Sequence, residues 1–126
     1  MTHPKFVHLR LHSEYSIVDG LVRIDEIVNA AAKDNQPAMA LTDLSNLFGL
    51  IKFYKAARKQ GIKPIAGCDV WVTNESERDK ATRLLLLVRT NQGYHNLCEL
   101  LTKAWIENQY KGRAEIRREW LVELKE

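Results

Sequence analysis

Residues 37–72, PAMALTDLSNLFGLIKFYKAARKQGIKPIAGCDVWV, contain a predicted strand, a predicted helix and a second predicted strand. The short apolar run that follows Pro37 is typical of a buried strand, and residues 64–72 are predicted as the next strand. Between them, residues 47–60 repeat apolar side chains at the spacing of an amphipathic helix, and Gly61 is placed to end it. This order predicts two parallel strands joined by a crossover helix. The side chains that we expect this helix to bury are Leu47, Leu50, Ile51 and Tyr54.

The same alternation of elements continues on both sides of this unit. Before it, residues 6–11 alternate apolar and polar side chains like a strand, and residues 23–33 have a helical period. After it, a charged loop over residues 73–82 leads to an apolar strand at residues 84–88. A longer helix follows at residues 94–108, and its expected buried stripe is Leu97, Leu100, Leu101, Ala104 and Trp105. We therefore predict an α/β fold in which helices cover a sheet of parallel strands.

Length and composition indicate one globular domain. The 126 residues are 45% hydrophobic and 28% charged, and the formal net charge of +3 is too small to argue for nucleic-acid binding. The longest apolar run, residues 84–88, is far shorter than a membrane span, and no secretory signal opens the sequence. We expect a cytoplasmic protein with no membrane partner. Cys68 and Cys98 match neither a disulfide framework nor a zinc site, so both are expected to be reduced.

The last residues, IRREWLVELKE, carry apolar side chains with a helical period at Ile116, Trp120 and Leu124. No glycine, asparagine or proline stop signal follows them. We expect the chain to be a piece of a longer protein.

Polar side chains lie at or near the ends of the predicted strands. Because the carboxyl ends of parallel strands meet at one edge of a sheet, these side chains are expected to converge on a site. The set is His12, Asp19, Thr42, Asp43, Asp69 and Arg83.

The stretch FVHLRLHSEYSIVDG, residues 6–20, bears on whether that edge could hold a metal ion. In an extended strand, His8, Arg10 and His12 share one face. Arg10 opposes a metal, because a guanidinium cannot ligate and would repel a divalent cation about 4 Å away by several kcal/mol. The candidate ligands are His12, Asp19 and Asp69, with His8 or Asp43.

Ordinary structural roles stay open for several of these residues. His8 could be a hydrogen-bonded histidine at the rim of the sheet, and Asp43 could cap the helix that begins near Leu47. Cys68 stands beside Asp69, but the sequence shows no base partner for a nucleophile. A basic run could contact DNA or form a solvated helix face, and its members are Lys111, Arg113, Arg117 and Arg118.

Three segments together resemble one known family. FVHLRLHSEYSIVDG, ALTDLSNLFGLIKFYKAARKQGIKPIAG and LLLLVRTNQGYHNL occur in the order found in the PHP (polymerase and histidinol phosphatase) domain. The form that they resemble opens the α subunit of bacterial replicative DNA polymerase III, and the likeness runs from about Lys5 to the last residue. The resemblance implies that residues 1–126 are the N-terminal portion of a PHP domain, the first half of a distorted (β/α)7 barrel, with the polymerase domains absent.

The resemblance also implies a metal site from which this chain departs. Members that bind metal carry histidine where Arg10, Leu44 and Arg83 stand, and glutamate where Asp69 stands. At the two remaining positions of the site, His12 and Asp19 match the family. We therefore predict no catalytic, cofactor-binding or metal-binding residues here, and a degenerate site made of Arg10, His12, Asp19, Leu44, Asp69 and Arg83.

We expect Arg10 and Arg83 to substitute for the missing cations by pairing with Asp19 and Asp69. The alternative is that both arginines point into solvent and contribute little.

For function, the resemblance implies that the complete protein extends templated DNA with Mg in a distant domain. A degenerate PHP domain would then be a structural platform that docks the separate epsilon proofreading exonuclease. The alternative is a residual metal-dependent phosphoesterase or 3′–5′ exonuclease that uses His12, Asp19 and Asp69 to activate water.

Overall fold

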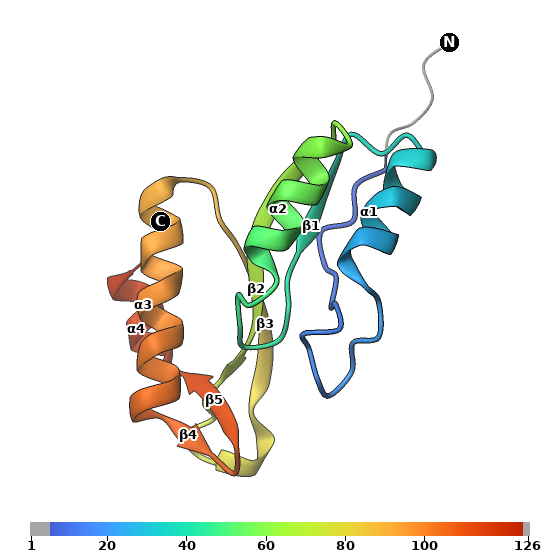
Figure 1. The fold of residues 1–126 in the computed structure, drawn as a ribbon. Helices are drawn as coiled ribbons and strands as arrows, with labels where there is room; N and C mark the ends of the chain where they lie inside the picture. The colour runs from blue at the N-terminus through green and yellow to red at the C-terminus, as the bar shows by residue number, and fades with distance from the viewer. Residues whose placement is uncertain (1–5, 125–126) are drawn as a thin grey trace.

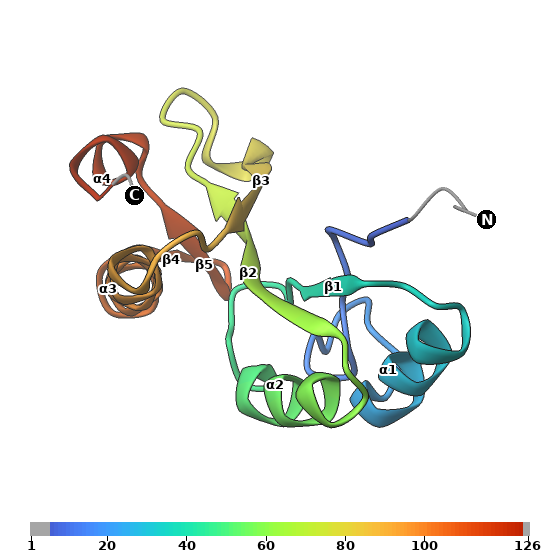
Figure 2. The same ribbon diagram turned by 90° about the horizontal axis from the view of Figure 1, so that it is seen from above.

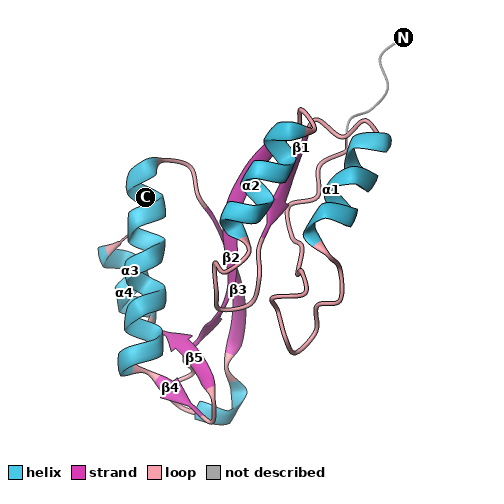
Figure 3. Ribbon diagram, in the orientation of Figure 1, coloured by secondary structure: helices cyan, strands magenta, loops and turns pink. Residues whose placement is uncertain are grey.

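The computed structural model describes residues 6–124, and helices alternate with strands along this part of the chain (Figure 1). The unit predicted from residues 37–72 is confirmed as a strand, a helix and a strand, and Gly61 follows the helix with a φ of 74°. In chain order the elements are α1 (Ile24–Lys33), β1 (Ala38–Leu41), α2 (Leu50–Lys59), β2 (Lys63–Val72), the short 3₁₀ turn η1 (Arg78–Lys80), β3 (Thr82–Leu87), α3 (Asn91–Glu107), β4 (Gln109–Tyr110), β5 (Arg113–Ile116) and α4 (Arg118–Glu123). Figure 3 shows the same elements coloured by type.

β2 is the central strand and pairs with three others. β1 runs parallel to its first half, and β5 runs parallel to its last residues, as expected for an α/β sheet. β3 instead runs antiparallel to β2, with Gly67 opposite Leu87 and Val72 opposite Thr82. The prediction of parallel strands is therefore wrong for β3. The reason is the connection, because a loop containing only η1 joins β2 to β3 and returns the chain as a hairpin.

The first predicted strand, residues 6–11, does not form a regular strand. This segment runs beside β1, where the carbonyl of His8 accepts a hydrogen bond from the N–H of Ala40 (2.9 Å). At Leu11 the carbonyl still accepts from the N–H of Thr42 (2.9 Å), but the N–H of Leu11 donates to the side-chain hydroxyl of Thr42 (2.8 Å) and not to a backbone carbonyl. The hydroxyl of Thr42 therefore takes the place of one backbone acceptor in the pairing of this segment with β1.

The hydrophobic core is divided into two clusters. Figure 2 shows α1 and α2 packed beneath β1 and the first half of β2, while α3 and α4 lie beside β5. The first cluster includes Ile24, Val28, Met39, Leu50 and Phe53. The second includes Cys68, Val70, Leu97, Leu100, Ala114, Ile116 and Trp120. Within residues 6–124, no helix is both long enough and apolar enough to span a bilayer.

The burial predicted for two helices needs correction. α2 starts at Leu50, and its buried side chains are Leu50, Phe53 and Ala57, whereas Ile51 is 62% exposed and Tyr54 is 47% exposed. The stripe at i, i+3 and i+7 therefore faces α1. Leu50 is buried as predicted, whereas Ile51 and Tyr54 lie on the open side of α2. On α3, the expected stripe is confirmed except for Trp105, which is 41% exposed.

The β4–β5 hairpin was not predicted. Its turn is formed by Lys111 and Gly112, both with positive φ (50° and 81°), which matches the twist of a two-residue hairpin. Ile116, which was assigned to the last helix, is instead the end of β5, where it lies opposite Val72 of β2. The final helix is correspondingly short, at Arg118–Glu123.

Candidate functional site

Asp69 lies at the centre of the site, late in β2. Its backbone N–H donates to the carbonyl of Asp43 (3.0 Å), which fixes this part of β2 against the chain that follows β1. The carboxylate is fully buried, and Arg10 donates to both of its oxygens, from Nε to Oδ2 (2.7 Å) and from Nη2 to Oδ1 (2.6 Å). This two-point contact is the strongest geometry available to an arginine and a carboxylate.

His12 connects Asp69 to a second carboxylate. Its Nε2 lies 2.8 Å from Oδ2 of Asp69, and its Nδ1 lies 2.7 Å from Oδ1 of Asp19. His12 therefore bridges the two carboxylates through its two ring nitrogens.

Arg83 closes the other end of the arrangement. Both of its terminal nitrogens lie 3.4 Å from Oδ2 of Asp19, and its guanidinium stacks 4.7 Å above the ring of Trp71. The antiparallel direction of β3 explains this position, because the start of β3 lies beside the end of β2. Both arginines thus pair with the two aspartates, as predicted, and neither extends into solvent without a partner.

The electrostatics favour ionised carboxylates at both aspartates. Burial opposes ionisation of Asp69, but hydrogen bonds and charge from Arg10 and His12 outweigh it and hold the pKa of Asp69 below its ordinary value. Burial is likewise outweighed at Asp19 by His12 and Arg83, so its pKa is also lowered. In turn, the hydrogen bonds and charge of Asp69 raise the pKa of Arg10. Arg10, Asp19 and Asp69 therefore remain charged at neutral pH.

Asp43 has a structural role that neither expectation anticipated. It does not cap α2, whose N-cap residue Gly49 has no side-chain cap. Its buried carboxylate instead accepts hydrogen bonds from the N–H of Ser13 (2.6 Å), the hydroxyl of Ser13 (2.8 Å) and the hydroxyl of Ser16 (2.8 Å). Asp43 therefore anchors the loop that carries His12 and Asp19, and it does not point at Asp69.

Three other candidate residues lie outside the group of charged side chains. The ring of His8 packs edge-on against Phe6, with ring centroids 4.7 Å apart. Leu44 stands opposite Asp69 in the backbone pairing, and it lines a cavity of about 230 Å³ together with Trp71. Burial raises the pKa of the Cys68 thiol to about 12, so this side chain stays protonated and is no nucleophile.

The residues present do not fit a cluster of divalent metal ions. Among residues 6–124, no three His, Cys, Asp or Glu side chains come together in an arrangement that could hold a metal ion. Both oxygens of Asp69 are already bound by Arg10, and both nitrogens of His12 face carboxylates. A metal ion bound to Asp69 would have to displace the guanidinium of Arg10 from the carboxylate and would be repelled by its positive charge.

The basic run is divided between elements and does not form a helix face. Lys111 lies 2.7 Å from Asp79, and Arg113 lies 3.2 Å from the buried Glu115. These two belong to the β4–β5 hairpin, whereas the other two cations of the run stand at the start of α4. Two of the four basic side chains, Lys111 and Arg113, are therefore already paired with carboxylates of the protein.

Sequence reasoning missed Ser13, Ser16 and Trp71. The two serines lie in the stretch HSEYS, which begins with His12, and short hydroxyl side chains in a loop are a common partner for a buried carboxylate. Trp71 offered a weaker signal, since it stands two positions after Asp69 and so on the same face of β2.

Comparison with known proteins gives a consistent family. Residues 8–126 match the PHP domain family. The chain is 50% identical over 121 residues to the DNA polymerase III subunit alpha of Pseudomonas fluorescens, covering 96% of this chain and 10% of that subunit. It is 45% identical over 126 residues to the corresponding subunit of Escherichia coli K12, covering all of this chain and 11% of that subunit. The chain therefore spans about a tenth of the length of these relatives.

Two solved structures share the fold. An amidohydrolase from Chromobacterium violaceum, with bound sulfate and no metal, superposes with a TM-score of 0.60 at 24% identity, over 78% of this chain and 32% of that protein. A predicted metal-dependent phosphoesterase from Bifidobacterium adolescentis gives a TM-score of 0.60 at 16% identity, over 80% of this chain and 34% of that protein. The open α/β sheet described here is thus the fold of a part of these larger proteins.

Proposed function

Because this chain belongs to the PHP domain family, we propose that it is the amino-terminal PHP module of a DNA polymerase III alpha subunit. Identity of 45–50% along the whole chain supports that assignment over the wider family. The parent protein would extend templated DNA with Mg bound in a domain far along the chain, and this module would contribute no residue to that reaction.

The module itself is a metal-free structural platform in this proposal. The single observation that carries it is the two-point contact of Arg10 with the buried carboxylate of Asp69. A permanent cation occupies the position from which an imidazole would have to ligate, and a second arginine pairs with Asp19. The site therefore keeps its shape and charge balance through protein side chains alone.

The proposed partner is the proofreading exonuclease, which would dock on this platform. The side-chain contacts described above support this role, because they join the loop after residue 12, β2 and β3 into one surface.

A second candidate function is residual metal-dependent hydrolysis of a phosphoester. It is favoured by the contacts of His12 with both Asp19 and Asp69, which place one imidazole beside two carboxylates. Binding would require Arg10 to leave Asp69, which makes this candidate the weaker of the two.

Hydrogen exchange of the full-length polymerase chain, with and without the exonuclease subunit, tests the docking role. We expect the exonuclease to slow amide exchange at surface segments within residues 6–124. In parallel, phosphoesterase activity of the full-length chain with manganese should be unchanged by His12→Ala and Asp19→Ala. Protection confined to other domains would contradict docking on this module. Manganese-dependent turnover that both substitutions abolish would favour the second candidate.

A further inference from the structure

One face of the sheet carries a row of charged and aromatic side chains that extends from Asp69 to the β4–β5 hairpin. Trp71 stands two positions after Asp69, so both side chains leave the same face of β2. Across the sheet, Trp71 lies opposite Arg83 of β3 and opposite Glu115 of β5. Side chains at opposite positions of neighbouring strands are direct neighbours. Trp71 is therefore the middle residue of this row.

The position of Arg83 depends on the ring of Trp71. Its guanidinium lies 4.7 Å from the ring centroid, while its terminal nitrogens lie 3.4 Å from Oδ2 of Asp19. The latter distance is longer than the roughly 2.7–3.2 Å of a typical N–H···O hydrogen bond, so the carboxylate alone holds this arginine loosely. Because Asp19 in turn contacts His12 (2.7 Å), the place of the ring affects the charged side chains around Asp69.

A second guanidinium lies against the same ring. Arg113 is 5.3 Å from the centroid of Trp71. Its Nε donates to Oε2 of the fully buried Glu115 (3.2 Å), and its Nη2 donates to the carbonyl of Arg78 (3.1 Å). Arg78 belongs to η1, and its own Nη2 lies 3.4 Å from Oε1 of Glu115. Arg113 therefore joins the ring to the β4–β5 hairpin and to the loop between β2 and β3.

We propose that Trp71 is a positioning residue that couples the charged side chains around Asp69 to the β4–β5 hairpin. The ring sets the place of Arg83 on one side and of Arg113 on the other. A displacement of either guanidinium lets the indole reorient, which weakens its contact with the other one. Movement of the hairpin therefore alters the charged group, and the reverse holds to the same degree because a coupling free energy is reciprocal. This inference is independent of the proposed docking role.

Amide hydrogen exchange in the full-length polymerase chain tests the coupling in two segments, the loop at residues 13–20 and the hairpin at residues 109–116. Arg83→Met should speed exchange in the hairpin, and Arg113→Met should speed exchange in the loop. Each change should be about two- to fivefold, the size expected for one cation–π contact at a partly exposed site. Both effects should disappear in the Trp71→Leu background, because the shared ring is then absent. Trp71→Tyr keeps an aromatic face and should retain both effects.

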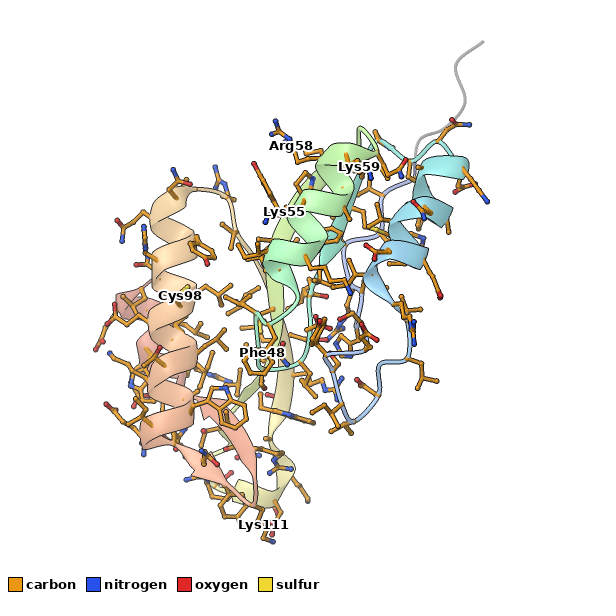
Figure 4. All side chains as sticks on the ribbon, in the orientation of Figure 1. Phe48, Lys55, Arg58, Lys59, Cys98 and Lys111 are labelled. Atoms are coloured by element: carbon orange, nitrogen blue, oxygen red, sulfur yellow. The ribbon has the colours of Figure 1, made fainter. Side chains whose placement is uncertain are left out.

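Arg58→Met is the matched control. Arg58 also lies over an aromatic ring, that of Tyr54, at 5.8 Å from the centroid. Figure 4 shows Arg58 on α2, far from Lys111 at the turn of the β4–β5 hairpin. This substitution removes the same kind of contact outside the row, so it should leave exchange in both segments unchanged.

Three results would overturn the proposal. Unchanged exchange in the hairpin of Arg83→Met would mean that the effect of this arginine ends at the ring. Equal acceleration in α1 of the same variant would show a general loss of stability and no specific coupling. A hairpin response to Arg83→Met that persists in the Trp71→Leu background would show that the coupling does not pass through the indole.

Discussion

Replacing Arg10 with Met is expected to lower the free energy of unfolding of this region by about 2–3 kcal/mol. The substitution leaves the fully buried carboxylate of Asp69 with His12 as its remaining side-chain partner. Breaking a buried pair costs about 3–5 kcal/mol when both partners are inaccessible, and the half-exposed side chain of Arg10 reduces that figure. Urea unfolding, or hydrogen exchange at the Asp69 amide in the full-length chain, measures the loss.

Three comparisons show whether the loss comes from the ion pair. Arg10→Lys should be intermediate, because it keeps the charge and loses the two-point geometry. Arg89→Met, on an exposed arginine just after β3, should change the free energy of unfolding by less than about 0.5 kcal/mol. Asp69→Asn combined with Arg10→Met should recover part of the loss, since no charge is then buried without its partner. Equal losses in Arg10→Met and Arg89→Met would contradict the account.

The stability difference caused by Arg10→Met should also depend on pH. The lowered pKa of Asp69 means that the ion pair contributes stability above the unfolded-state pKa of about 3.9, and this contribution is lost as the pH falls through the folded-state pKa. The gap between the two proteins should therefore narrow below about pH 4. A gap that stays constant down to pH 2 would mean that Asp69 is not the group that Arg10 stabilises.

Asp43→Ala should have an effect of similar size, about 3 kcal/mol, for a different reason. The substitution removes the acceptor for the Ser13 N–H and for the hydroxyls of Ser13 and Ser16, all of which are buried. Each buried donor left without a partner costs about 1–3 kcal/mol. We also expect faster hydrogen exchange at the amide of Gly20, because it donates to the carbonyl of Ser16 in the same loop.

Asp34→Ala is the matched control for this substitution. Asp34 follows α1 and is exposed, and its carboxylate accepts only from the side chain of Gln36 (3.0 Å) among residues 6–124. Its loss should cost less than about 0.5 kcal/mol. An Asp43→Ala protein as stable as Asp34→Ala would show that the loop is held by something other than this carboxylate.

Local pattern was enough to predict the central part of the fold. The apolar run after Pro37, the helical period and Gly61 identified β1, α2 and β2, because each signal arises from residues close in sequence. Period alone did not fix which side of α2 is buried. Phe53 and Ile51 are both apolar, and only the position of α1 decides that Phe53 faces inward.

Features set by distant partners were harder to predict. The direction of β3 depends on the loop after β2, which was identified but not interpreted as a hairpin connection. The β4–β5 hairpin depends on positive φ angles at Lys111 and Gly112. A lysine rarely adopts a positive φ, so the sequence did not indicate this turn. In the site, the pairing of two arginines with two aspartates was expected from the family resemblance and charge balance, without saying which arginine pairs with which aspartate. The role of Asp43 required knowing that the loop of Ser13 and Ser16 folds over it.

The most direct test of the central claim is the metal content of the full-length chain. The protein would be treated with chelator, reloaded with manganese or zinc, passed through gel filtration and analysed for retained metal, with His12→Ala and Arg10→His beside it. If a guanidinium holds the carboxylate of Asp69, the unaltered protein should retain no metal that depends on His12. Retention of one or more manganese or zinc ions per chain, lost in His12→Ala, would contradict the account.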